Sequence, residues 1–213
     1  MTAATRSVAA VYTTGPEHVR RLFVAYQASI AGLRTVCRQL LGLEGTHLRS
    51  KCVGTLLAAA AVDGKGALFP LAIAVVDANN YKNWLWFLIE LRTLLEANSP
   101  NLQCLTFLPD LQKGLIDGVQ KFFSDAFQGF CMRHLSENFQ KVFKNVSLMK
   151  LLCQAAYAST DVEFDTKMSE IEEISIEAKE LIVGIAKNLC ANSTFEGERF
   201  GHLTFKIAES LSD

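Results

Sequence analysis

A cysteine and a histidine stand at metal-ligand spacing in Cys131-Met132-Arg133-His134, where an apolar run gives way to a helical pattern. A thiolate and an imidazole at this CxxH spacing can share one zinc ion. A structural zinc site takes four ligands, and no convincing second pair is present, although Cys190 and His202 are spare candidates. The residues alone therefore leave two interpretations: a zinc site at Cys131 and His134, or buried structural roles for both.

Three carboxylates form a second set of candidates. Asp110 comes directly after a short apolar run and before a helical pattern, and functional groups in open α/β sheets gather at the carboxyl ends of strands. Glu44 lies between the first predicted helix and a predicted hairpin, and Glu209 lies near the end of the chain. Each has an ordinary alternative, which is a helix N-cap for Asp110, a loop carboxylate for Glu44 and an exposed helical residue for Glu209. Local pattern alone does not bring the three together.

The first half of the chain predicts a helix, a hairpin and a second helix. Residues 17–41 carry apolar side chains at helical spacing. The short apolar runs 53–62 and 68–76 flank Asp63-Gly64-Lys65-Gly66, a strong turn signal, so they predict a β-hairpin in which Pro70 marks an edge position or a strand start. Asn79 and Asn80 can cap the next helix, whose apolar stripe we expect to be core: Trp84, Phe87, Leu88, Leu91 and Leu95.

The second half predicts a strand over residues 103–108, a helix after Asp110 and a short strand over 127–131. Residues 136–190 have a helical pattern throughout, and the final segment 200–212 contains one more candidate helix. This order predicts a mixed α/β architecture with a helical insertion.

The composition indicates a soluble globular protein, because 50% of the 213 residues are hydrophobic and 20% are charged. The net charge of −1 gives no global argument for nucleic acid. Basic residues nevertheless outnumber acidic ones in residues 1–52, and acidic residues dominate 161–180, so the front of the chain favours phosphates more than the rear. Two solvated faces of opposite sign are the alternative.

The scattered cysteines predict buried thiols in a reducing compartment rather than a disulfide framework. No signal peptide is visible, and the longest apolar stretch, residues 53–62, is too short to span a membrane. We therefore expect an intracellular protein without a membrane partner. A homo-oligomer stays open.

Several motifs in order resemble the transposase domain of Mutator-like elements, over roughly residues 20–213. They are Gly45-Thr46-His47-Leu48, Leu68-Phe69-Pro70-Leu71-Ala72 followed by Val75-Val76-Asp77, Asn83-Trp84-Leu85-Trp86-Phe87-Leu88, Pro109-Asp110-Leu111-Gln112-Lys113-Gly114-Leu115, Cys131-Met132-Arg133-His134-Leu135-Ser136-Glu137-Asn138-Phe139, Arg199-Phe200-Gly201-His202-Leu203-Thr204 and Ile207-Ala208-Glu209-Ser210.

The resemblance implies an RNase H-like mixed sheet flanked by helices and a DDE-type site for DNA cleavage and strand transfer. Three carboxylates would hold two divalent cations, Mg²⁺ or Mn²⁺, that activate the attacking oxygen. Asp110 matches the second acid of the motif, Glu209 is the best match to the third, and Glu44 stands at the first. DNA as partner and the nucleus as location follow from the same resemblance.

Together with the predicted elements, the resemblance divides the chain into four parts. They are a helical lead-in (1–41), an RNase H-like core (42–135), an all-helical insertion (136–198) and a truncated final catalytic helix (199–213).

The departures from the family motif bear on activity. The family has Asp-Gly-Thr-His where this chain has Glu44-Gly45-Thr46-His47, and the family arginine after the second acid is Leu111 here. The longer glutamate displaces the carboxylate by roughly 1 Å, a misplacement that can cost about 100-fold in rate. We therefore expect a degenerate or domesticated remnant of the transposase. An active transposase and a DNA-binding transcriptional regulator derived from one are the alternatives.

Overall fold

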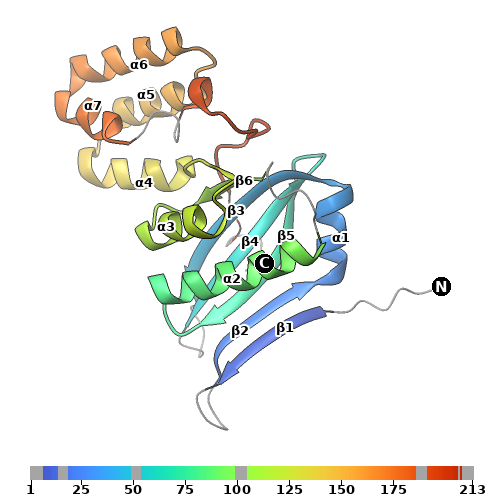
Figure 1. The fold of residues 1–213 in the computed structure, drawn as a ribbon. Coiled ribbons are helices and arrows are strands. Elements are labelled where there is room, and N and C mark those ends of the chain that lie inside the picture. The colour runs from blue at the N-terminus through green and yellow to red at the C-terminus, as the bar shows by residue number, and fades with distance from the viewer. Residues whose placement is uncertain are drawn as a thin grey trace.

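The strands in the described part of the chain form one seven-stranded mixed sheet with the order β1-β2-β5-β4-β3-β6-β7 (Figure 1). The computed structural model describes residues 7–13, 19–48, 54–98, 105–185, 191–205 and 207. The strands are β1 (Ser7–Thr13), β2 (Val19–Tyr26), β3 (Cys37–His47), β4 (Thr55–Asp63), β5 (Leu68–Val76), β6 (Thr106–Pro109) and β7 (Phe127–Gln128). The helices are α1 (Gln27–Thr35), α2 (Tyr81–Asn98), α3 (Lys113–Phe122), α4 (Met132–Phe143), α5 (Val146–Tyr157), α6 (Asp161–Ile174), α7 (Ile176–Val183) and the 3₁₀ turn η2 (Asn192–Thr194). The predicted mixed α/β fold with added helices is confirmed.

The helix predicted over residues 17–41 is wrong. Within the described part of this range, residues 19–41, only α1 is helical, and it lies between β2 and β3. Phe23 and Ala25 are buried while Leu22 and Val24 are half-buried, an alternation that suits a strand between β1 and β5. The few apolar residues of such a short segment fit both the helical and the strand period. Pairing with the neighbouring strands therefore determines that the segment is a strand. The part predicted as a helical lead-in, residues 1–41, therefore contributes β1, β2 and the first residues of β3 to the sheet.

The predicted hairpin is confirmed as β4 and β5, which pair antiparallel. The Asp63 carboxylate holds the turn by accepting hydrogen bonds from the backbone N–H groups of Lys65 and Ala67, both at 2.8 Å. Pro70 is not on an edge strand, because β5 lies between β2 and β4. It does stand near the start of β5, ahead of Ala72 where the pairing with β2 begins, so its missing N–H costs no hydrogen bond there.

Helices α1, α2 and α3 cover one face of the sheet (Figure 1). Asn80 caps α2 as predicted, because its side-chain oxygen accepts a hydrogen bond from the Asn83 N–H at 3.0 Å. The expected apolar stripe of α2 is buried in the core under these helices. A smaller cluster covers the opposite face of the sheet, where Phe205 and Ile207 pack on side chains of the central strands.

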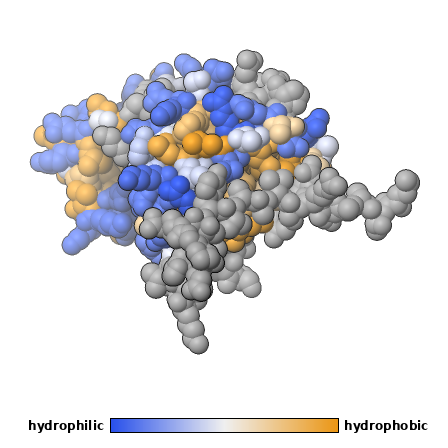
Figure 2. Space-filling view, turned by 60° about the horizontal axis from the view of Figure 1, so that its bottom comes forward, coloured by the Kyte–Doolittle hydropathy of each residue, from blue (hydrophilic) through white to orange (hydrophobic). Residues whose placement is uncertain are grey.

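Helices α4 to α7 form a separate unit beside the β6–β7 edge (Figure 1). They share their own apolar cluster, and side chains of Asn145, Thr160 and Ser175 cap α5, α6 and α7. The helical pattern predicted for residues 136–190 is confirmed as far as Val183, where α7 ends, and residues 186–190 lie outside the described residues. In the view of Figure 2, hydrophilic and hydrophobic residues are interspersed over the described surface. Among the described helices, none is long and apolar enough to cross a membrane.

Of the segment 200–212, predicted to contain the last helix, residues 200–205 are not helical and Ile207 is helical. Residues 206 and 208–212, Glu209 among them, lie outside the described residues.

Candidate functional site

Parallel pairing of β3 and β6 brings two of the three predicted acids together. Leu43 pairs with Pro109, and the N–H of Asp110 donates a hydrogen bond to the Leu43 carbonyl at 3.0 Å. Glu44 and Asp110 are therefore the next residues on two neighbouring strands. Glu44 is part of β3 and not a loop residue as the alternative had it. Asp110 follows the carboxyl end of β6, as expected.

Asp110 does not cap the following helix. Gln112 is the N-cap residue of α3, and the Gln112 N–H bonds to the Asp110 carbonyl at 2.7 Å. The N-cap alternative for Asp110 is therefore wrong, and its carboxylate is left to face α4. There it lies beside His134, which is in the first turn of that helix.

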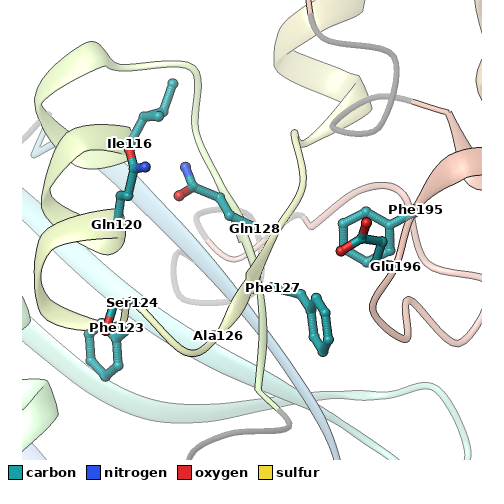
Figure 3. Close-up of a pocket in the computed structure, with 9 residues that line it drawn as sticks. All are labelled: Ile116, Gln120, Phe123, Ser124, Ala126, Phe127, Gln128, Phe195 and Glu196. Atoms are coloured by element: carbon teal, nitrogen blue, oxygen red, sulfur yellow. The ribbon is translucent and has the colours of Figure 1, made fainter.

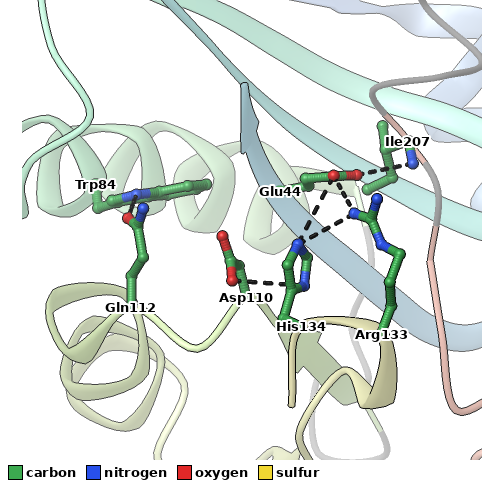
Figure 4. Close-up of polar contacts among 7 residues, drawn as sticks. All are labelled: Glu44, Trp84, Asp110, Gln112, Arg133, His134 and Ile207. Carbon is green, nitrogen blue, oxygen red and sulfur yellow. Dashed lines mark hydrogen bonds and ion pairs between the residues drawn. The ribbon is translucent and has the colours of Figure 1, made fainter. Parts of the chain in front are cut away.

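The carboxylate of Glu44 is bound at both oxygens (Figure 4). Arg133 Nη2 donates to Oε1, and the backbone N–H of Ile207 donates to Oε2 at 2.9 Å. The Glu44 side chain is only 8% exposed, so these donors replace water around the charge. The Arg133 pair joins residues from β3 and α4 and thus ties the helical unit to the sheet.

His134 stands between the two acids (Figure 4). Its Nδ1 lies 3.4 Å from Asp110 Oδ1, and its Nε2 lies 3.9 Å from Glu44 Oε1 and 3.1 Å from Arg133 Nη2. A guanidinium only donates hydrogen bonds, so Nε2 must accept here and the ring proton belongs on Nδ1, facing Asp110. The side chains of both His134 and Asp110 are mostly buried.

The mutual contacts and burial shift three ionisation equilibria. Burial raises the pKa of the Asp110 carboxyl above its usual range, against the opposing attraction of His134. Burial opposes charge on Cys131 and on His134 as well, but their mutual interaction prevails. It lowers the pKa of the Cys131 thiol and raises that of the imidazole. The site therefore combines a carboxyl group with a raised pKa, Asp110, and a thiol–imidazole pair in which the charged forms of Cys131 and His134 are favoured.

The CxxH pair sits at the start of α4, with Cys131 as the N-cap residue. Cys131 is buried, and His134 is directed at the acids. Of the two spare candidates for a zinc site, Cys190 lies outside the described residues and His202 lies beside Gly66 at the β4–β5 turn. Across the described ranges, no three His, Cys, Asp or Glu side chains come close enough to hold a metal ion. A zinc ion at Cys131 and His134 stays a prediction.

The arrangement does not fit two divalent cations. Two such ions sit about 3.5–4 Å apart and need carboxylate oxygens that are open toward both. Both oxygens of Glu44 already accept hydrogen bonds, and the cation beside Oε1 is the guanidinium of Arg133. His134 occupies the space between Glu44 and Asp110.

Sequence reasoning missed Arg133, and it treated Trp84 only as core. Trp84 is core, but its indole N–H also donates to Asn79 Oδ1 at 2.8 Å and Gln112 Oε1 at 2.9 Å. Gln112 starts the helix after Asp110, so Trp84 braces the segment that carries the second acid (Figure 4). A buried tryptophan usually has a hydrogen-bond acceptor for its indole N–H. This general rule is the signal from which polar partners of Trp84 could have been predicted.

A separate hollow of about 310 Å³ lies between α3, β7 and the segment at Phe195 and Glu196 (Figure 3). Phe127 and Phe195 meet edge to face beside it. None of Glu44, Asp110, Arg133 or His134 lines this hollow, so it is distinct from the site of the two acids.

The comparison with known families agrees with this geometry. The family model described as MULE transposase domain matches residues 40–138, a range that includes both acids and the CxxH pair. No curated protein matches the chain. Residues 40–138 of this chain are thus similar to the MULE transposase domain, the family that the sequence motifs resemble.

Proposed function

We propose that this chain is a degenerate or domesticated remnant of a DNA cleavage and strand-transfer enzyme. Support comes from the match to the transposase domain and from the adjacency of Glu44, in β3, to Asp110, which directly follows β6. Cleavage of a phosphodiester requires concentrated positive charge at the attacking and leaving oxygens, which paired metal ions supply in such enzymes. The two acids lie where the metal-binding carboxylates are expected, but Arg133 and the Ile207 N–H already bind the carboxylate of Glu44.

The observation that carries the proposal is the engagement of Glu44. Glutamate at this position is one methylene longer than the aspartate of the family motif, and its carboxylate is held between Arg133 and the Ile207 N–H. A divalent ion would have to displace a cation from a mostly buried carboxylate. Misplacement by about 1 Å alone costs on the order of 100-fold in rate.

A cleavage assay tests this proposal. End-labelled duplex DNA is incubated with the purified chain and Mg²⁺ or Mn²⁺, alongside Asp110→Ala and Glu44→Asp variants. We expect no cleavage above the Asp110→Ala background from the natural chain. Cleavage by the natural chain that disappears in Asp110→Ala would overturn the proposal. The Glu44→Asp variant asks whether the shorter acid alone restores activity.

The alternative of a DNA-binding regulator gains little support from the described residues. It rests on the basic side chains of residues 1–52. Arg21 instead donates to Asn83 and stacks on Trp86, and Arg38 stacks on Phe200. Both guanidinium groups are thus used inside the fold.

A further inference from the structure

The position beside Glu44 that a metal ion would take is filled by a side chain. We propose that the guanidinium of Arg133 is an internal counter-ion that closes a site for one divalent cation. Glu44 Oε1 and His134 Nε2 would be the ligands of that ion, and Asp110 would orient the imidazole. This inference builds on the proposed function, because it explains how the site lost its affinity for metal, but its ligand set differs from three carboxylates.

Two ligand atoms already converge on one point. Arg133 Nη2 contacts both Glu44 Oε1 and His134 Nε2, and these two acceptors lie 3.9 Å apart. Oxygen and imidazole ligands bind first-row divalent ions at about 2.0–2.2 Å, so two atoms at that separation can both reach one ion between them. A nitrogen of Arg133 stands where that ion would be.

The imidazole is already prepared for metal binding. Because Nε2 accepts from Arg133, the ring proton is on Nδ1, which lies 3.4 Å from Asp110 Oδ1. Metal-binding histidines commonly carry a carboxylate on the nitrogen opposite the metal, and that partner fixes the tautomer. Asp110 stands on this side of His134 at 3.4 Å, and among the described residues the buried Nδ1 makes no hydrogen bond, so the carboxylate is the group placed to accept its proton.

The carboxylate of Glu44 is mostly buried and therefore needs a cation beside it. The side chains of Glu44, His134 and Arg133 are 8%, 14% and 21% exposed. A buried carboxylate that loses its partner is strongly disfavoured. Among the described residues, moreover, the buried Nε–H of Arg133 has no hydrogen-bond acceptor, so the arginine is held mainly through Nη2.

The test is a cation titration of Arg133→Ala without DNA. Co²⁺ is the probe, because imidazole suits such ions and the visible absorption of Co²⁺ changes when nitrogen enters its coordination shell. Arg92→Ala is the matched control, since Arg92 pairs with Glu96 on the exposed side of α2. We expect Arg133→Ala to bind Co²⁺ at least about tenfold more tightly than the natural chain or Arg92→Ala. Mg²⁺ should bind more weakly than Co²⁺.

Further variants assign the ligands. In the Arg133→Ala background, His134→Ala and Glu44→Gln should each abolish the gain. Asp110→Asn should reduce it about 10- to 100-fold without abolishing it, as expected for a residue that only orients a ligand. A gain that survives His134→Ala but disappears in Cys131→Ala would overturn the proposed ligand set.

Other results of the Co²⁺ titration also support or contradict the proposed cation site. If Arg133→Ala is unfolded without metal, recovery of its fold on adding Co²⁺ supports the proposal and failure to recover contradicts it. A folded Arg133→Ala that gains no affinity contradicts it, as does Co²⁺ binding by the natural chain that is lost in Glu44→Gln. Cleavage of DNA by the natural chain would overturn the proposed function, whereas this titration contains no DNA and fails or succeeds separately.

Discussion

Leu43 and Pro109 face each other across the parallel pair of β3 and β6, and the residue after each is an acid. The hydrogen bond from the Asp110 N–H to the Leu43 carbonyl continues this pairing to the end of β6. The register of two short strand segments thus sets Glu44 beside Asp110. A change that disturbs β3 near Leu43 should therefore affect both the stability and the site.

Gly42→Ala is the first such change. A Cβ at position 42 would overlap the ring of Phe205, which packs on this face of β3. Phe205 lies two residues before the Ile207 N–H that binds Glu44. We expect Gly42→Ala to lower the free energy of unfolding by about 1–3 kcal/mol, the usual cost of overpacking. Urea denaturation followed by circular dichroism measures this loss.

Gly64→Ala is the control for Gly42→Ala. Gly64 lies in the β4–β5 turn, and the nearest atom to its Cβ would be the Val36 carbonyl oxygen at an ordinary 3.7 Å. We expect little change in stability. An equal loss in the two variants would show that the loss comes from adding any methyl group and not from the contact with Phe205.

Trp84→Phe tests the brace on the segment after Asp110. The variant removes the N–H that Asn79 and Gln112 accept, and it leaves two side-chain oxygens without their donor. Leaving such groups unsatisfied costs about 1–3 kcal/mol, which we expect to see as a lower urea midpoint. In a Gln112→Ala background the loss should be smaller, because one acceptor is already gone. Equal losses in the two backgrounds would contradict the bond to Gln112.

Local signals predicted the elements whose structure depends on nearby residues. The hairpin followed from Asp63-Gly64-Lys65-Gly66, and the structure shows why, since the Asp63 carboxylate closes the turn within four residues. The same holds for α2, where Asn80 caps the helix three residues ahead of Asn83. Residues 19–26 were assigned wrongly because their strand identity depends on pairing with β5, far along the chain.

The site was predictable only in part for the same reason. The family resemblance indicates Glu44 and Asp110 together, and in the structure Glu44 lies in β3 beside the end of β6, which Asp110 directly follows. Nothing near Arg133 in the sequence indicated its partner, because Glu44 lies 89 residues earlier. The ion pair between Glu44 and Arg133 is a long-range contact, which local sequence patterns do not predict.

A double-mutant cycle should reveal the coupling between Glu44 and Arg133. Glu44→Gln and Arg133→Gln each leave a mostly buried charge without its counter-ion. We expect the double variant to lose less stability than the sum of the two single losses, with a coupling of about 1–3 kcal/mol, between the values for exposed and fully buried pairs. Urea unfolding of the four proteins gives the coupling directly. The Arg92–Glu96 pair is the exposed comparison and should couple by less than about 1 kcal/mol.

Asp110→Asn should stabilise the protein at neutral pH. Burial raises the pKa of Asp110 in the folded state, so folding favours the protonated acid over the carboxylate. The stability that this group contributes is complete below its unfolded pKa and is lost as pH rises through the raised folded value. Asparagine cannot ionise and avoids that loss. The urea midpoint of Asp110→Asn should therefore exceed that of the natural chain at pH 7, and the difference should shrink as pH falls toward the ordinary value of 3.8.

Asp63→Asn is the control with the opposite sign. The hydrogen bond from the Ala67 N–H and then that from Lys65 lower the pKa of Asp63 in the fold. Its carboxylate therefore contributes stability above its unfolded pKa, and this contribution disappears as pH falls through the lowered folded value. We expect Asp63→Asn to reduce the urea midpoint at pH 7, with the difference from the natural chain narrowing in acid. If Asp110→Asn were also destabilising at pH 7, the carboxylate of Asp110 would be a net stabiliser through His134, and burial would not be the dominant influence on it.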